Sequence, residues 1–138
     1  MRKYPDRPIV GVGAIVLDGD RVLLVRRANE PLKGEWSLPG GAVAIGGTLE
    51  EGVVREIREE TGLEITVGAV VAVLDRIRRD AGGGVEYHYV IIDYAATVRG
   101  GQLAAGSDAG DVRWVATGDL EGLGVSATAI GVIRKATG

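Results

Sequence analysis

Cysteine is absent from the 138 residues, and histidine occurs once, at His88. Without cysteine the chain has no disulfide, no thiolate nucleophile and no cysteine-based zinc site. A single histidine cannot build a histidine metal cluster, so His88 is expected to be structural or to contact the edge of a ligand.

Long apolar runs are also missing. No apolar stretch approaches the roughly 20 residues that a membrane helix needs. The N-terminal residues "MRKYPDRPIVGVG" contain no continuous apolar core and no small-residue cleavage site of a secretory signal. These features predict a cytoplasmic protein without a membrane partner.

The charge pattern excludes broad binding to a phosphate backbone. The net charge is −3 and no long basic run occurs, so DNA is not expected as a partner. Two nucleotide motifs and one hydrolase motif are missing as well. The segment "GVGAIV" lacks the third glycine of a dinucleotide fingerprint, and the chain has neither a lysine phosphate loop nor a Gly-x-Ser-x-Gly elbow.

What is present predicts one mixed α/β domain over residues 1–138. Apolar residues make up 46% of the chain, enough for a real core, and the 23 glycines are dispersed between apolar segments as in tight turns. The patterns predict strands at 10–17, 21–26, 65–77, 86–98 and 112–115, a short strand at 42–44, and helices at 48–61 and 126–136. Residues 27–47 read as a long loop punctuated by Gly and Pro, and long loops in compact domains are often functional.

The first predicted helix carries three carboxylates within two turns. Glu56, Glu59 and Glu60 lie in the stretch "REIREETGL", where each like-charged neighbour costs roughly 0.2–0.5 kcal/mol on an exposed helix. One interpretation is an ordinary solvated face, with Arg55 pairing with Glu51 or Glu59 four positions away.

Helical geometry favours another interpretation. At about 100° per residue, Leu49, Val53 and Ile57 form an apolar stripe along the predicted helix. Glu56 and Glu60 project close to Leu49, at the border of this stripe, and no Lys or Arg projects between the two carboxylates. Hard divalent ions such as Mg²⁺ take oxygen ligands and complete their shell with water and substrate phosphates. The three carboxylates are therefore interpreted as holders of a metal ion that neutralises an anionic substrate.

Residues 41–63 resemble the Nudix box of diphosphate hydrolases. That box reads Gly, five residues, Glu, seven residues, then Arg-Glu-aliphatic-any-Glu-Glu-any-Gly-aliphatic. Eight of the nine specified positions match in spacing, namely Gly41, Arg55, Glu56, Ile57, Glu59, Glu60, Gly62 and Leu63. The flanking "GVGAIVLDGDRVLLVRR" and "GEWSLPGG" are also typical of the family.

One box position departs from the pattern. Gly47 stands where the first glutamate is expected, and Ala44 stands where many relatives carry another. In the family the first glutamate commonly supports the box arginine, so Arg55 is left to find another partner, for which Glu51 and Glu59 are the candidates. Gly47 is therefore either a tolerated variant or an engineered change, or it is a cause of lowered or lost hydrolysis.

The resemblance implies a fold, a metal and site residues. The fold is the Nudix α/β/α sandwich with a mixed β-sheet, and the metal is Mg²⁺, with Mn²⁺ as a substitute. The implied metal ligands are Glu56, Glu59, Glu60 and Gly41, and the implied catalytic residues are Glu56, Arg55 and Asp108, with Asp111 as the competitor of Asp108. Arg26 and Arg27 are candidates for substrate phosphate contacts, with an exposed strand end as the alternative.

The resemblance also implies a substrate class. The leading expectation is hydrolysis of the pyrophosphate of a nucleoside diphosphate derivative, with ADP-ribose yielding AMP and ribose 5-phosphate. This is because "YPDRPIVGVGAIVL", "EYHYVIIDY" and "SDAGDVRWV" resemble small bacterial ADP-ribose pyrophosphatases. The alternatives are a nucleoside triphosphate pyrophosphohydrolase and a catalytically weak nucleotide-binding module. Relatives that cleave ADP-ribose are often homodimers.

Overall fold

The computed structural model describes residues 3–29, 32–106 and 109–138. Strands form at β1 (Ile9–Asp18), β2 (Arg21–Arg27), β3 (Trp36–Ser37), β4 (Gly40–Ala42), β5 (Leu63–Arg79), β6 (Val85–Gly101) and β7 (Ala109–Ala116). The helices are α1 (Leu49–Thr61) and α2 (Ala127–Thr137), with two short 3₁₀ turns, η1 (Thr117–Asp119) and η2 (Glu121–Leu123). The mixed α/β prediction is confirmed.

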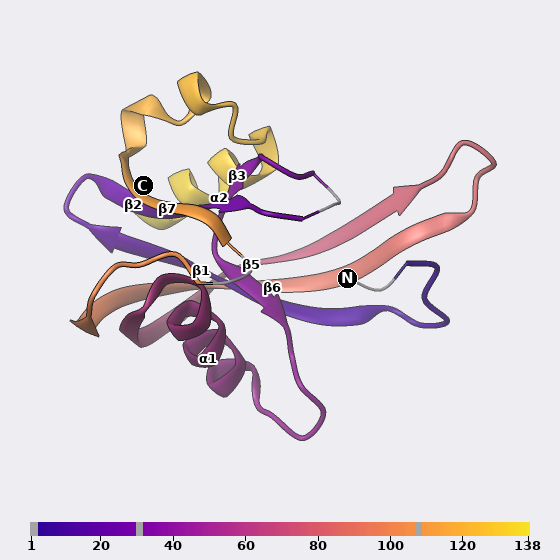
Figure 1. Ribbon diagram of the computed structural model, residues 1–138, viewed down its shortest axis with the longest axis horizontal. Helices are drawn as coiled ribbons and strands as arrows, with labels where there is room; N and C mark the ends of the chain where they lie inside the picture. The colour runs from indigo at the N-terminus through magenta and orange to yellow at the C-terminus, as the bar shows by residue number, and fades with distance from the viewer. Residues whose placement is uncertain (1–2, 30–31, 107–108) are drawn as a thin grey trace.

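The central strand is β1, and it joins the two halves of the sheet. It pairs in parallel with β6 and antiparallel with β4 and β2, while β5 and β6 form a long antiparallel hairpin. On the other side, β2 pairs with β3 and β7. Figure 1 shows α1 on one face of this sheet and α2 on the other, with the β5–β6 hairpin reaching beyond both helices.

Two apolar cores, one on each face, hold the three layers together. Alternate residues of β1 point to opposite faces, as a pleated strand requires. Val12 joins the core with Val53 and Ile57 of α1, and Ile15 joins the core with Ile133 of α2. Over the described residues, neither helix is long and apolar enough to cross a membrane.

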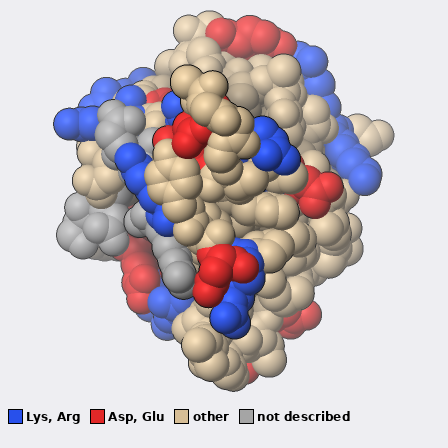
Figure 2. All heavy atoms as spheres, turned by 90° about the vertical axis from the view of Figure 1, so that its right-hand side faces the viewer, with Lys and Arg blue, Asp and Glu red and all other residues tan. Residues whose placement is uncertain are grey.

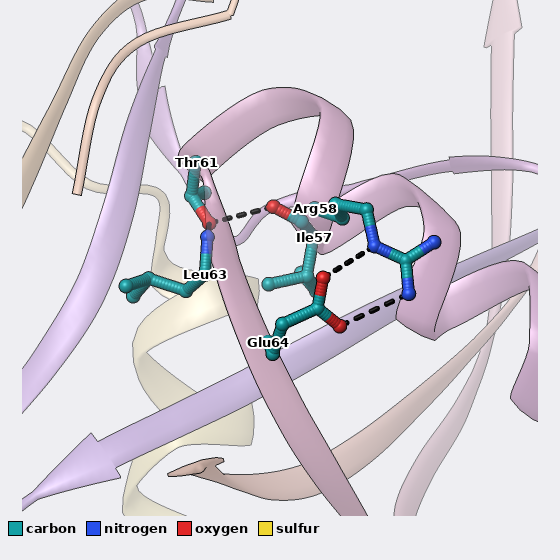
Figure 3. Close-up of polar contacts among 5 residues, drawn as sticks. All are labelled: Ile57, Arg58, Thr61, Leu63 and Glu64. Carbon is teal, nitrogen blue, oxygen red and sulfur yellow. Dashed lines mark hydrogen bonds and ion pairs between the residues drawn. The ribbon is translucent and has the colours of Figure 1, made fainter. Parts of the chain in front are cut away.

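Helix α1 ends at Thr61, as predicted, and begins at Leu49, one residue after the predicted start, because Thr48 is its N-cap. The Thr48 hydroxyl accepts a hydrogen bond from the Glu51 backbone N–H (3.1 Å), and Gly62 ends the helix in the left-handed conformation at φ 76°. Thr61 locks the helix end, because its buried hydroxyl donates to the Ile57 carbonyl (2.6 Å) and accepts from the Leu63 N–H (3.2 Å), as Figure 3 shows.

The prediction for the short strand was wrong in position. The apolar residues Ala42–Ala44 indicated a strand there, but β4 lies two residues earlier and pairs with Gly11–Gly13 of β1. A β-carbon on Gly40 would lie 2.1 Å from the Val12 carbonyl oxygen, so only glycine fits this approach. The position of β4 is therefore determined by its close backbone contact with β1, and the strand preferences of Ala42–Ala44 do not determine it.

Candidate functional site

The carboxylate of Glu56 lies against the backbone of Gly41. Burial of Val53 and Ile57 fixes the rotation of α1, and the Glu56 side chain is left only 15% exposed beside β4. A β-carbon on Gly41 would lie 2.5 Å from the Glu56 carboxyl carbon. The glycine at position 41 is therefore what lets the Glu56 carboxylate lie close to the strand.

Glu60 reaches the neighbouring residue of the same strand. The backbone N–H of Gly40 donates to the Glu60 carboxylate at 3.4 Å, a long hydrogen bond. The structure thus brings Glu56 and Glu60, predicted to be metal ligands, to two adjacent glycines of β4. Gly41 was expected from the box, whereas Gly40 was not, although the Gly-Gly pair at residues 40 and 41 was an available signal.

Arg55 has partners even though position 47 is glycine. Its guanidinium lies 3.3 Å from a Glu56 carboxylate oxygen and 3.6 Å from a Glu59 carboxylate oxygen, and it donates to the Ala42 carbonyl at 3.3 Å. Of the two proposed substitutes, Glu59 forms an ion pair with Arg55, whereas Glu51 lies beside Arg55 in the lining of a pocket. The contact with Glu56 was not among the predicted ones, and it is possible because the Arg55 side chain is long.

Gly47 borders an open pocket of about 310 Å³ beside Arg55. The pocket is lined by residues 44–47 together with Glu51, Gly52 and Arg55. A β-carbon on Gly47 would meet only the Ala44 carbonyl oxygen, at 3.3 Å. The loop therefore accepts a β-carbon at position 47, where the box normally has glutamate, only if the Ala44 carbonyl shifts by a few tenths of an ångström.

The segment after β6 packs on the C-terminal end of α1. The Gly106 N–H donates to the Glu60 carbonyl at 2.9 Å, and the Ala104 N–H donates to the Thr61 carbonyl at 2.9 Å. A β-carbon on Gly106 would lie 2.0 Å from the Glu59 carbonyl oxygen, so this contact requires glycine. Asp108, predicted as general base, lies outside the described residues.

Asp111, the competitor of Asp108, is engaged locally. Its carboxylate accepts from the Val112 N–H at 2.8 Å and lies 3.3 Å from the Arg113 guanidinium. These contacts are those of an ordinary strand residue.

The residues of α1 fit a hard cation by the chemistry of their donors. Glu56 and Glu60 are carboxylates that converge on β4, and Glu59 is one turn from Glu56 on the same helix. Within residues 3–29, 32–106 and 109–138, however, no three acidic or histidine side chains lie close enough to form a ready-made metal cluster. The carbonyl of Gly41 as a ligand stays a prediction.

Arg26 lies over the ring of Trp36 on the neighbouring strand. The Arg26 guanidinium is 5.9 Å from the ring centroid, and the Arg113 guanidinium is 4.8 Å from it. Trp36 is itself buried, in the core that faces α2. Phosphate contacts by Arg26 and Arg27 stay predictions.

Comparison with known proteins gives the same family throughout. The NUDIX domain model matches residues 7–134. The chain is 42% identical over 107 residues to an ADP-ribose pyrophosphatase of Methanocaldococcus jannaschii, covering 78% of this chain and 61% of that protein. It is 37% identical over 112 residues to a putative 8-oxo-dGTP diphosphatase of Bacillus subtilis, covering 80% and 68%.

Solved structures agree. A MutT NUDIX hydrolase from Burkholderia pseudomallei superposes with a TM-score of 0.82 at 30% identity, covering 94% of this chain and 98% of that one. The NUDIX domain of Shewanella oneidensis NrtR, complexed with ADP ribose, superposes with a TM-score of 0.74 at 25% identity, covering 96% and 88%. The expected fold is confirmed, and the acidic helix α1 against the glycines of β4 is the box of that fold: this chain belongs to the Nudix family.

Proposed function

We propose that the chain hydrolyses the pyrophosphate bond of a nucleoside diphosphate derivative with the help of Mg²⁺ or Mn²⁺. The observation that carries this proposal is the convergence of Glu56 and Glu60 on Gly40 and Gly41, with Arg55 holding Glu56 and Glu59. Carboxylates gathered beside two glycines suit a cation and the phosphate oxygens that it carries.

Glu56, Glu59 and Glu60 would hold the divalent ion. When bound, such an ion offsets the charge that develops on the phosphate oxygens and lowers the pKa of a coordinated water. The residues of the chain would orient the ligands of the ion. Arg55 is proposed to keep the carboxylates of Glu56 and Glu59 in place.

The remaining step is removal of a proton from the attacking water. The water oxygen bonds to one phosphorus of the pyrophosphate, and the bridging P–O bond breaks as the other phosphate leaves. We assign this general-base role to Glu56 or to Asp108. Glu56 is favoured by its partial burial beside Gly41.

Among substrates we favour ADP-ribose, cleaved to AMP and ribose 5-phosphate. Support comes from the 42% identity to the Methanocaldococcus jannaschii protein, of whose length this chain spans about three fifths. The putative 8-oxo-dGTP diphosphatase relative supports a second candidate, pyrophosphohydrolysis of a nucleoside triphosphate. Gly47 and the pocket beside it support a third, a catalytically weak nucleotide-binding module.

Product analysis separates these candidates. Purified protein with Mg²⁺ or Mn²⁺ is given ADP-ribose and a panel of nucleoside triphosphates, with Glu60→Gln as control. AMP with ribose 5-phosphate is the expected product pair, and nucleoside monophosphate with inorganic pyrophosphate would favour the second candidate. If neither class is cleaved by the wild-type chain or by Gly47→Glu, the binding module is favoured.

The Gly47→Glu variant also tests the missing box glutamate directly. Gly47 and Arg55 line the same pocket, so once the Ala44 carbonyl has shifted by a few tenths of an ångström we expect a carboxylate at position 47 to pair with Arg55 and kcat to rise or stay unchanged, with folding preserved. Gly47→Gln, which adds a similar volume without charge, is the matched control. A loss of activity in Gly47→Glu alone would contradict this role for the pocket.

The homodimer implied by the family stays a proposal as well. Its test is the molar mass of the protein in solution by light scattering.

A further inference from the structure

The 102–106 segment, which follows β6, crosses the last turn of α1 with its backbone. The Gly106 N–H donates to the Glu60 carbonyl and the Ala104 N–H donates to the Thr61 carbonyl, both at 2.9 Å. The last four carbonyls of a helix have no partner within the helix. In α1 these carbonyls belong to residues 58–61, so the 102–106 segment satisfies two of the four.

Gly106 is required by the closeness of this contact. A β-carbon at position 106 would lie 2.0 Å from the Glu59 carbonyl oxygen and 3.3 Å from the Glu60 Cα. Gly106 does not have positive φ, so its backbone conformation would accept another residue. The reason for a glycine here is therefore the approach to the backbone of the two glutamates.

The 102–106 segment buries almost no side chain in this contact. Residues 102–105 are exposed, including Leu103 at 37%, and Gly106 has no side chain. Exposed side chains contribute little hydrophobic stabilisation. The end of α1 is also fixed without this segment, because Gly62 caps the helix and the Thr61 hydroxyl bonds to the residues on either side of the cap. Stability alone therefore does not account for the close contact.

The backbone that this segment contacts belongs to two predicted metal ligands. Glu60 is held at two points, since its carboxylate accepts from the Gly40 N–H at 3.4 Å and its carbonyl accepts from Gly106. The Glu59 carbonyl lies against Gly106, and the Glu59 carboxylate lies 3.6 Å from the Arg55 guanidinium. Because the ends of helices fray, a restraint on this turn acts directly on the positions of both carboxylates.

We propose that the 102–106 segment is a positioning element of the metal site, in which Gly106 fixes the backbone from which Glu59 and Glu60 extend. This inference rests on the proposed function, because it takes these two carboxylates as ligands of the divalent ion. Groups that orient metal ligands contribute about 10- to 100-fold to metal affinity. The affinity for the ion should therefore depend on a glycine that is not itself a proposed ligand.

The first test is titration of the metal-free protein with Mn²⁺, followed by EPR in the absence of substrate. We expect Gly106→Ala to raise the Kd of Mn²⁺ about tenfold or more, because the added methyl must displace the Glu59 carbonyl and weaken the bond to Glu60. Gly100→Ala is the steric control, because a β-carbon there meets nothing within 4 Å. A Kd of Gly106→Ala equal to that of the wild type would overturn the proposal.

A second control separates ligand position from overall stability. Ile133→Val removes one methylene from the core on the other face of the sheet and should lower the urea midpoint without changing the Kd of Mn²⁺. The urea midpoint of Gly106→Ala is measured beside it. An equal rise of the Kd in Ile133→Val would show that metal affinity follows stability in general, and this result would overturn the proposal.

Binding of the ion elsewhere on the surface is not expected to obscure these measurements. Figure 2 shows one face of the molecule, on which the acidic side chains drawn in colour lie in separate groups, most of them beside Lys or Arg. A carboxylate next to a cation attracts a divalent ion less strongly than several carboxylates together do. The Kd should therefore report mainly on the carboxylates of α1.

The third test uses the wild-type chain and does not depend on the folding of any variant. Coupling between two sites is reciprocal, so an ion that binds the ordered turn more tightly must also stabilise the contact of that turn with Gly106. Saturating Mg²⁺ should slow the amide hydrogen exchange of Gly106 and Ala104 about tenfold or more, as measured by NMR. The control is the Asp80 N–H, which donates to the Gly84 carbonyl at the tip of the β5–β6 hairpin. Exchange of Gly106 at the same rate with and without Mg²⁺ would overturn the proposal.

The outcomes separate this inference from the proposed function. Weaker Mn²⁺ binding in Gly106→Ala supports the positioning role even if no pyrophosphate substrate is hydrolysed. Metal-dependent hydrolysis together with an unchanged Mn²⁺ affinity in Gly106→Ala would overturn the positioning role and keep the function. A wild-type chain that binds neither Mg²⁺ nor Mn²⁺ would overturn both.

Discussion

Single glycines decide how close the acidic residues of α1 approach the sheet. Gly41 leaves space for the Glu56 carboxylate, and Gly40 brings its N–H to Glu60 and its Cα to the Val12 carbonyl. Neither glycine has positive φ, so backbone conformation does not require them. The requirement is steric, and it links the identity of two small residues to the position of two carboxylates.

The variant Gly41→Ala tests this link. The added methyl would lie 2.5 Å from the Glu56 carboxyl carbon and must displace it, so kcat should fall by about a hundredfold, as expected for a misplacement of about 1 Å. The measurement is steady-state hydrolysis. Gly100→Ala in β6 is the control, because a β-carbon there meets nothing within 4 Å. Equal activity in the two variants would contradict a positional role for Gly41.

Asp93 is a second carboxylate whose place depends on a glycine. It is 4% exposed, on the face opposite α1, and its Oδ1 lies 2.3 Å from the position of a β-carbon on Gly13. Burial raises the pKa of Asp93 to about 6, against a smaller opposing attraction from Arg76. The folded chain therefore binds this proton more tightly than the unfolded chain does.

The raised pKa of Asp93 makes the free energy of unfolding depend on pH. Between about pH 4 and pH 6 the unfolded chain loses the Asp93 proton first, so this group lowers the free energy of unfolding as pH rises, by about 3 kcal/mol at most. Asp93→Asn should match the wild type near pH 4 and exceed it in stability at pH 8. Urea unfolding at both pH values checks this, with the exposed Asp20→Asn as control. Equal stability gains at both pH values would contradict the account.

At the scale of elements, α1 is held at its end by a buried hydroxyl. Thr61 bonds both to the helix, at Ile57, and to the start of β5, at Leu63. The nearby Arg58–Glu64 ion pair, also drawn in Figure 3, is exposed and should matter little to stability. Orientation of α1 against β5 therefore depends on Thr61 more than on the ion pair.

The isosteric variant Thr61→Val removes the hydroxyl and leaves the Leu63 N–H without its partner. We expect a loss of about 1–3 kcal/mol in the free energy of unfolding, the cost of a buried unsatisfied group. The shift of the urea midpoint measures it, and Thr97→Val, at an exposed threonine of β6, is the control. No difference between the two variants would show that Thr61 does not lock the helix end.

The helices and most strands could be predicted because local signals specify them. Thr48 and Gly62 bound α1 by capping, and Ser126 caps α2 through the Ala129 N–H. The position of β4 could not be predicted, since it depends on backbone approach to β1. The strands β5 and β6 run longer than their patterns predict, since Leu63 still pairs with Gly101 at one end and Arg79 with Val85 at the other.

The candidate site was predictable in part. The resemblance to the box predicted roles for Glu56, Glu59, Glu60 and Arg55, and the structure brings Glu56, Glu60 and Arg55 together beside β4, while their roles stay predictions. Glu59 was predicted as a partner of Arg55, but the contacts of Arg55 with Glu56 and with the Ala42 carbonyl were not, because they depend on how far the long Arg55 side chain reaches. The contacts that a long side chain makes depend on the folded structure, and the periodicity of the sequence does not predict them.

For the molecule as a whole, we propose that the carboxylates of α1 hold the metal ion on which pyrophosphate hydrolysis by this chain depends. The most direct measurement is the initial rate of ADP-ribose cleavage against Mg²⁺ concentration, for metal-free wild type and for Glu60→Gln. We predict saturable dependence on the metal in the wild type and a kcat lower by about a hundredfold in the variant, a loss typical of removing a group that stabilises transition-state charge. Cleavage without added metal, or full activity in Glu60→Gln, would contradict the claim.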